Sequence, residues 1–254
     1  MKRWAWGVLG CLLVGVIFLF VEMQQKSKRC MGVIVKLDEN AEYPFFTEQD
    51  IENLLTLKGV DVIVGMSFSK INLKGLEKRV LKNRLIKKCE VFRDLSGNLV
   101  VTIEQQRPVG RLINTITVEK QALSASQGGY LTETGEIVPL SVRFAARTVL
   151  VSGDFFEKKQ NLKTLKGQQL ITFLKNLQQN PFWKAQVAEV IVDKDTELTL
   201  VPQVGQHQID FGLPDDIEVK FKKLKIFYKT ILPLKGWDKY KRVSVKFKNQ
   251  IVCE

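Results

Sequence analysis

The sequence predicts an α+β protein with a single N-terminal transmembrane helix, and three observations support this class. Residues 4–21 contain no charged side chain. Residues 32–106 show the order strand, helix, helix, strand, strand, and residues 107–254 are rich in short strands. We therefore expect a tail of residues 1–3, a membrane helix over 4–21, one domain over 30–106 and a β-rich domain over 107–254.

The membrane helix is predicted from the run WAWGVLGCLLVGVIFLFV at residues 4–21. A helix of this length covers roughly 27 Å, which is about the thickness of the bilayer hydrocarbon. The residues expected to anchor it in lipid are Trp4, Trp6, Leu12, Phe18 and Phe20. A cleaved signal peptide is the alternative, but the residues after the run lack a small-residue cleavage site.

Basic residues flank the run on both sides: Lys2 and Arg3 precede it, and Lys26, Lys28 and Arg29 follow it. Counting positive charges on short flanks normally predicts which end of a membrane helix is cytoplasmic. Here the two flanks are nearly equal, so charge alone leaves the orientation open.

The domain over 30–106 opens with alternating apolar residues over 32–37, which is typical of a strand. Thr47 and Asp50 have the spacing of a capping box and predict the start of a helix. Apolar residues three and four positions apart over 73–81 predict a second helix.

Two strands are expected next, over 86–93 and 99–104, with a turn at Ser96-Gly97-Asn98 between them. Two helices on one face of a three-stranded sheet bury both apolar stripes. We expect the other face of that sheet to be exposed.

Pro108 ends this unit, and the region that follows is β-rich. We expect a hairpin around Thr134-Gly135 and strands over 147–151, 187–192, 197–201, 208–211 and 243–248. Two helices are expected among these strands: one holds Leu170 to Leu177 and is stopped by Pro181, and the last holds Phe221 to Ile231 and is broken by Pro233 and Gly236.

The closing strand over 243–248 alternates strictly, with Val243, Val245 and Phe247 apolar and basic or polar residues between them. Because it comes last and follows a helix, it is predicted to lie exposed at an edge of the sheet. An edge with lysines resists promiscuous pairing, and the same edge accepts a strand from a chosen partner. The pattern alone leaves both interpretations open.

Composition excludes several classes of function. The formal charge is +12, but the lysines interleave with apolar residues, as on the exposed faces of ordered elements, so we expect no nucleic-acid binding. Cys30, Cys89 and Cys253 are far apart and His207, the single histidine, has no acidic or cysteine cluster around it in the sequence. We therefore expect no metal, no cofactor and no disulfide framework.

Catalytic motifs are not found either. The chain has no phosphate-binding glycine motif, no zinc-protease motif and no nucleophile elbow. The carboxylate pairs Asp193/Asp195 and Asp215/Asp216 stand where aspartate caps helices or forms turns. We expect no enzyme, no catalytic residue and no small-molecule substrate.

The order of these parts resembles the FtsQ/DivIB family of bacterial cell-division proteins over essentially the whole chain. Three segments support the resemblance: VTIEQQRPVGR at 101–111, YLTETGE at 130–136, and GWDKY at 236–240 followed by VSVKFKNQIVC at 243–253. Two departures are that Ser244-Val245-Lys246-Phe247 replaces a family "D-L-R-Y" and that Gly110 replaces a commoner alanine.

The resemblance implies that residues 30–106 are a POTRA-like domain and that the protein is a scaffold of the divisome. It implies a cytoplasmic N-terminus, a single span of the inner membrane, and periplasmic C-terminal domains at the division site. The implied partners are small coiled-coil proteins of the FtsB and FtsL type, bound by strand addition, which helps couple septal peptidoglycan synthesis to division. The residues expected at that edge are Val243, Val245, Lys246, Phe247, Lys248 and Gln250.

Two other functions stay open at this point. A POTRA-type accessory of polypeptide transport or outer-membrane assembly would share the first domain, although such systems usually carry several of these domains. A membrane-anchored enzyme acting on the cell wall would need a cleft with converging acid and base groups.

Overall fold

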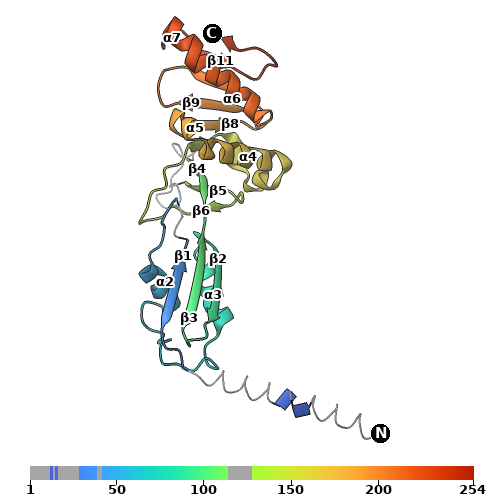
Figure 1. Cartoon of the computed structure of the whole chain (residues 1–254). Coiled ribbons are helices and arrows are strands. Elements are labelled where there is room, and N and C mark those ends of the chain that lie inside the picture. The colour runs from blue at the N-terminus through green and yellow to red at the C-terminus, as the bar shows by residue number, and fades with distance from the viewer. Residues whose placement is uncertain (1–11, 14, 17–28, 39–41, 114–127) are drawn as a thin grey trace, which may run out of the picture. The chain divides into compact units, whose positions relative to one another are not determined.

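The computed structural model describes residues 12–13, 15–16, 29–38, 42–113 and 128–254 (Figure 1). The chain forms two compact units that divide between Gln105 and Gln106. Each unit has its own sheet and its own buried side chains, so each is described by itself.

Most of the predicted membrane helix, including Trp4, Trp6, Phe18 and Phe20, lies outside the described residues. Leu12, the remaining expected anchor, is in a helical stretch and is 62% exposed. Within the described part of the chain, no helix is both long enough and apolar enough to cross a membrane.

The first unit contains the predicted five elements in the predicted order. They are β1 (Val33–Leu37), α2 (Glu48–Leu55), α3 (Leu73–Leu81), β2 (Ile86–Arg93) and β3 (Leu99–Gln105). The sheet order is β1-β3-β2, with β1 parallel and β2 antiparallel to the central strand β3. The predicted capping box is present, since the side chains of Thr47 and Asp50 each accept from the other's backbone N–H.

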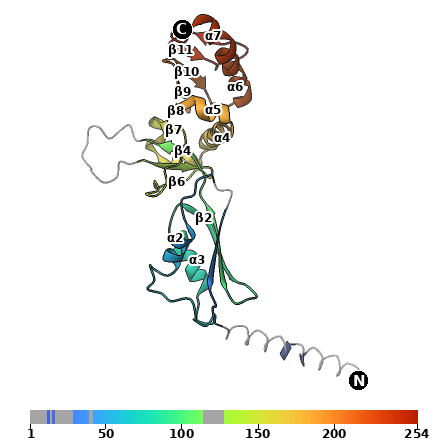
Figure 2. The same cartoon turned by 60° about the vertical axis from the view of Figure 1, so that its left-hand side comes forward.

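Both helices lie on one face of this sheet (Figure 2). Ile51 and Leu55 of α2, and Leu76 and Val80 of α3, are buried there. On the opposite face Lys36, Lys88 and Glu90 are exposed, as expected. Val100 is buried on that face because its register partners Ile34 and Phe92 flank it.

The second unit is built on a nine-stranded sheet of order β12-β11-β10-β9-β8-β7-β4-β5-β6. Its strands are β4 (Pro108–Leu112), β5 (Gly129–Thr132), β6 (Ile137–Val138), β7 (Leu150–Ser152), β8 (Val187–Val192), β9 (Leu198–Pro202), β10 (Gln208–Gly212), β11 (Arg242–Ser244) and β12 (Val252–Cys253). Its helices are α4 (Leu165–Gln179), α5 (Pro181–Gln186), α6 (Ile217–Ile226) and α7 (Leu232–Lys235), with short 3-10 turns at Asp154–Glu157 and Lys159–Lys163.

Helices α4, α5 and α6 pack against one face of the sheet through an aromatic cluster (Figure 2). Phe173 of α4 meets Phe211 of β10 at 4.9 Å between ring centroids, and Trp183 of α5 stacks on Phe221 of α6 at 4.6 Å. Stacked and edge-on aromatic pairs stabilise beyond the area that they bury. The cluster therefore joins three helices to the C-terminal half of the sheet.

Three details of the second unit differ from the sequence predictions. Pro108 opens strand β4 instead of only ending the first unit. Pro181 stops α4 as predicted but also begins α5, because proline is favoured at the first helical position. Pro233 does not break the last helix: a π-turn at Phe227–Ile231 widens the backbone ladder before it, and the helical run ends at Gly236.

Candidate partner-binding edge

The predicted edge strand over 243–248 is wrong in its extent and in its position. The strand β11 ends at Ser244, and β10 pairs with it on one side while β12 pairs with it on the other. The chain turns back after β11 with Asn249 in the left-handed region, at φ +63°. The edge of the sheet therefore belongs to β12, and β11 lies one strand inside it.

Lys223 of α6 explains why β11 stops where it does. Its ammonium donates to the carbonyl oxygens of Val245 and Phe247, at 2.6 and 2.7 Å. These carbonyls bind a helix side chain instead of a neighbouring strand, so the ladder ends after the Val245 N–H, which still donates to the Asp210 carbonyl at 3.0 Å. Burial and the nearby charge of Lys220 lower the pKa of Lys223.

The free side of β12 follows from the hydrogen-bond alternation of an antiparallel pair. Arg242 and Glu254 exchange both backbone hydrogen bonds, at 3.1 and 2.9 Å. The next facing pair, Val243 and Cys253, is therefore a non-hydrogen-bonded pair. The N–H and C=O of Cys253 consequently point away from β11, toward the side of β12 on which no strand lies among the residues that the structure describes.

The six residues predicted for partner binding occupy different environments. Val243 and Val245 are fully buried in the core, as their alternation predicted. Lys246 forms an ion pair with Asp210 at 3.2 Å, so its charge is already partly neutralised. Phe247 is 43% exposed, and Lys248 and Gln250 are exposed on the turn between β11 and β12.

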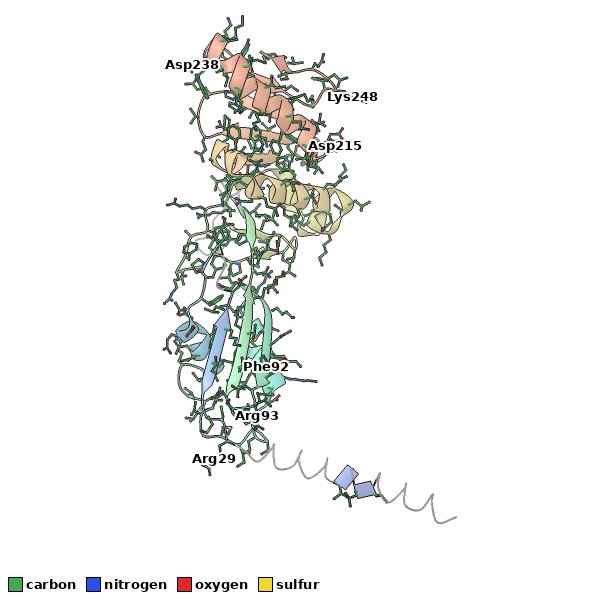
Figure 3. The ribbon with its side chains drawn as sticks, in the orientation of Figure 1. Arg29, Phe92, Arg93, Asp215, Asp238 and Lys248 are labelled. Atoms are coloured by element: carbon green, nitrogen blue, oxygen red, sulfur yellow. The ribbon has the colours of Figure 1, made fainter. Side chains whose placement is uncertain are left out.

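Lys248 lies toward the Asp215 end of α6, and Asp238 lies at the other end of this helical run (Figure 3). Phe247, Lys248 and Gln250 thus stand beside the free edge, without forming it. Sequence reasoning missed β12 itself and the role of Lys223. The Asn249-Gln250 pair after an alternating run was the one local signal of a turn, since asparagine tolerates the left-handed region.

A buried hydrogen bond supports the sheet behind this edge. His207 Nε2 lies 2.9 Å from the hydroxyl of Tyr228, and His207 is 1% exposed. Burial lowers the pKa of His207, and burial raises the pKa of Tyr228 to about 12. His207 immediately precedes β10 and is a core residue.

Of the two carboxylate pairs, Asp193/Asp195 forms the turn expected of it, whereas Asp216 at the start of α6 makes no side-chain capping bond. The Asp193 side chain accepts from the backbone N–H groups of Asp195 and Glu197, at 2.9 and 2.8 Å, and so closes a turn. Asp215 pairs with the buried ammonium of Lys220, and Asp216 precedes α6. Among the described residues, no group of His, Cys, Asp and Glu side chains could hold a metal ion.

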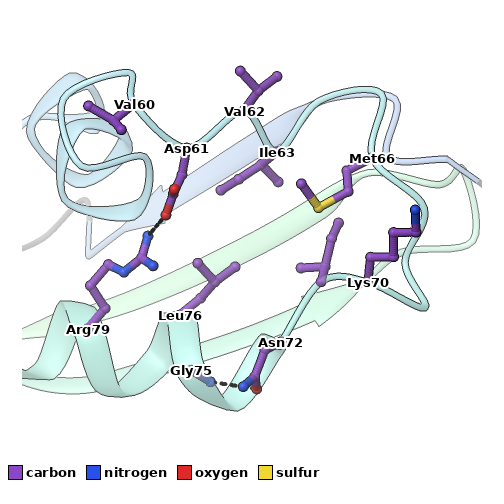
Figure 4. A pocket seen from close by; sticks show the side chains of 11 residues that line it. Val60, Asp61, Val62, Ile63, Met66, Lys70, Asn72, Gly75, Leu76 and Arg79 are labelled. Carbon is purple, nitrogen blue, oxygen red and sulfur yellow. Dashed lines mark hydrogen bonds and ion pairs between the residues drawn. The ribbon is translucent and has the colours of Figure 1, made fainter.

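The first unit contains a pocket of about 530 Å³ between the segment 60–66 and α3 (Figure 4). Its walls combine apolar residues, among them Val62, Ile63 and Leu76, with polar and charged ones. The carboxylate of Asp61 pairs with Arg79 at 2.7 Å at one side of the pocket. The ion pair thus places a charged carboxylate beside the apolar lining residues of the pocket.

The first unit is a strand-helix-helix-strand-strand domain, and the second is a mixed α/β domain that ends on an open sheet edge. Together they define a two-domain protein in which a small domain of POTRA-like element order precedes a larger, β-rich domain. The family model described as "POTRA-like domain" matches residues 28–104. The family model described as "FtsQ/DivIB, C-terminal related" matches residues 99–254.

The chain therefore belongs to the FtsQ/DivIB family, whose members are cell-division scaffolds that take part in protein–protein interactions of the divisome. A search of the curated proteins found no match to the chain.

Proposed function

We propose that this protein is a bitopic scaffold of the divisome. In this proposal residues 4–21 anchor it in the inner membrane with the N-terminus in the cytoplasm, and residues 30–106 and 107–254 form its periplasmic POTRA-like and β domains. The protein binds small coiled-coil division proteins of the FtsB and FtsL type, and so helps couple septal peptidoglycan synthesis to division. Family membership and the apolar run support this proposal.

One observation supports the mode of binding: the backbone N–H and C=O of Cys253 point outward from the last strand of an open sheet. An extended partner segment gains main-chain hydrogen bonds when it pairs with such an edge. The edge is short, with only Val252–Cys253 in ladder geometry, which limits promiscuous pairing. The bound segment therefore continues along residues 251–254 and contacts the turn before β12.

The turn supplies specificity in this proposal. Phe247 offers a half-exposed aromatic face, and Lys248 and Gln250 offer polar groups beside the incoming strand. Residues 218–254 hold eleven Lys and Arg against three Asp and Glu, so the region attracts an acidic partner. Charges at the rim of an interface act mainly on the association rate and on its salt dependence.

The test is a pull-down of FtsB-like and FtsL-like chains by the full-length protein and two variants at one position. Cys253→Pro removes the outward N–H but leaves the bonds between Arg242 and Glu254 in place. Cys253→Val keeps both main-chain groups and changes only the side chain. We expect the proline variant to lose capture and the valine variant to retain it.

Circular dichroism and thermal unfolding, measured in parallel, test whether each variant is folded. If Cys253→Pro is unfolded, Ile251→Pro tests the next outward-facing position along the same edge. Full capture by a folded proline variant would show that strand addition at β12 is not the binding mode. A mid-cell ring of the fluorescently tagged protein is expected, whereas an even envelope signal would favour an accessory of polypeptide transport.

A further inference from the structure

Three loops of the first unit meet at the end where the chain enters it. They cover residues 29–32, 63–67 and 94–98, and we call them together the loop end. The Cys30 N–H donates to the Met66 carbonyl at 2.9 Å, the Gly65 N–H donates to the Cys30 carbonyl at 2.7 Å, and the Met31 N–H donates to the Gly97 carbonyl at 2.9 Å. Figure 3 shows Arg29 and Arg93, the last residue of β2, at this end.

Two of the loops are tight turns that display an apolar residue at the same position. The Gly97 N–H donates to the Asp94 carbonyl at 3.3 Å, which places Leu95 at the first central position of a turn. The Met66 N–H donates to the Ile63 carbonyl at 3.1 Å, which places Val64 at the equivalent position. Gly65 has φ of +85°, as the second central position of a type II turn requires, whereas Gly97, with φ of +89°, is the last residue of the other turn.

The loop end exposes several large apolar side chains. Leu95 is 98% exposed, Met31 71%, Val64 51% and Met66 39%. Arg29 and Lys70 are exposed close by in the sequence. Single exposed apolar residues are common, but a group of them on hydrogen-bonded loops marks a contact surface.

The sequence before the loop end indicates what covers it. The uncharged run over 4–21 ends eight residues before Arg29. Even a fully extended chain of eight residues spans at most about 28 Å. The interval between this run and the loop end, residues 22–29, contains three basic residues: Lys26, Lys28 and Arg29. At this distance from the run, they would be within reach of the anionic lipid headgroups of a bilayer.

We propose that the loop end is a lipid-contacting surface. In this arrangement four apolar side chains enter the headgroup region of the inner membrane from its periplasmic side: Met31, Val64, Met66 and Leu95. Arg29 and Lys70 contact lipid phosphates. Apolar side chains flanked by basic residues are the usual composition of a surface that lies in the membrane interface. The inference rests on the proposed anchor over 4–21, and it adds a second contact between the protein and the membrane.

The experiment uses the full chain, reconstituted in vesicles of phosphatidylethanolamine and phosphatidylglycerol. A maleimide fluorophore that senses polarity is attached at Leu95→Cys in a chain that carries Cys11→Ser and Cys253→Ser. Cys30 and Cys89 are 1% and 6% exposed, so the parent chain without Leu95→Cys measures their residual labelling. A phospholipid with a nitroxide on its headgroup serves as the quencher.

Leu81→Cys is the matched control because Leu81 is also apolar and is 41% exposed. It is the last residue of α3 and lies near the start of β2, whose eight residues then run to Arg93 at the loop end. A strand of this length separates its two ends by roughly 25 Å. The two probes therefore report opposite ends of the same unit.

We expect the probe at position 95 to lose fluorescence on addition of the nitroxide lipid and to emit at shorter wavelength than in detergent, and the probe at position 81 to do neither. Equal, weak quenching at both positions in protein that resists carbonate extraction would overturn the inference and leave the anchor intact. Protein that carbonate removes from the vesicles would refute the anchor and this inference with it. The inference would also be overturned if the probe at position 95 emitted at shorter wavelength only after FtsB-like and FtsL-like chains were added and the nitroxide lipid did not quench it. That result would assign the loop end to a protein partner.

Discussion

The ammonium of Lys223 on α6 lies 2.6 Å from the carbonyl oxygen of Val245, just beyond the end of β11. The same nitrogen lies 2.7 Å from the carbonyl oxygen of Phe247. One lysine thus ties the last long helix to the turn that returns the chain as β12. The free edge of the sheet depends on a contact between residues more than twenty positions apart.

Lys223→Met is expected to loosen this turn while the helix remains. The variant leaves two carbonyls without their charged donor, and the loss of such a hydrogen bond costs about 1–3 kcal/mol. Hydrogen exchange of the backbone amides of β11 and β12 is the measurement, and we expect faster exchange there. Lys222→Met, at the exposed neighbouring position, is the control, and equal exchange in the two variants would contradict the role of Lys223.

A glycine is expected to be required at position 110 because a side chain of the neighbouring strand approaches its backbone closely. A Cβ atom at this position of β4 would lie 2.6 Å from Cγ2 of Val151 on β7, which is too close for two carbon atoms. Gly110→Ala should destabilise the second unit by about 1–3 kcal/mol, as overpacking usually does. Urea unfolding of the full chain measures it.

The double variant Gly110→Ala with Val151→Ala tests the physical cause. Removing the valine methyl groups makes room for the new Cβ atom, so the two substitutions should cost less together than the sum of their separate effects. Strict additivity in the double-mutant cycle would show that the close approach is not the reason for glycine.

Gln105 is expected to hold the segment before α2 onto the end of β3. Its side-chain oxygen accepts from the backbone N–H groups of Phe45 and Phe46, at 2.8 and 3.2 Å, and the residue is 4% exposed. Gln105→Leu leaves both donors buried without that acceptor, which should cost about 2–4 kcal/mol. Hydrogen exchange at residues 45–46 and thermal unfolding are the measurements.

Gln49→Leu, on an exposed helix position, is the matched control for that substitution. It makes the same chemical change without removing a buried acceptor. Similar unfolding temperatures for the two variants would refute the importance of the Gln105 contact.

His207 is expected to make stability depend on pH in the acidic range. Burial lowers its pKa below the ordinary 6.5, so the unfolded chain binds a proton at this residue more readily than the folded one. The stability that the neutral, buried His207 contributes to the folded state is fully present above about pH 6.5. It is lost as the pH falls toward the lowered pKa of the folded state. We expect the free energy of unfolding to fall between pH 7.5 and pH 5.5.

His207→Gln isolates this effect, because glutamine keeps a polar group near the Tyr228 hydroxyl and does not titrate in this range. Denaturant unfolding at a series of pH values should show a shallower decline for the variant than for the original chain. Parallel curves would show that other groups carry the whole pH dependence.

Local patterns in the sequence determined most of the individual elements. The capping box at Thr47, the 3.6-residue spacing over 73–81 and the two-residue alternation over 99–104 each report a periodicity that one segment contains by itself. The turn at Gly135, where φ is +79°, was also predictable because glycine alone adopts that conformation at no steric cost. For the first unit these patterns were sufficient to predict the element order.

The tertiary structure decided where the open edge lies. The alternation over 243–248 predicted correctly that Val243 and Val245 are buried, but it could not show that Lys223 binds the carbonyls of Val245 and Phe247. Nor could it show that residues 252–253 return to pair with β11, because strand pairing depends on contacts between distant segments. The sequence by itself determined which elements form and where most of their apolar faces lie, whereas the contact of α6 with residues 245–247 and the return of β12 decided which strand forms the edge of the sheet, because both depend on segments distant in the chain.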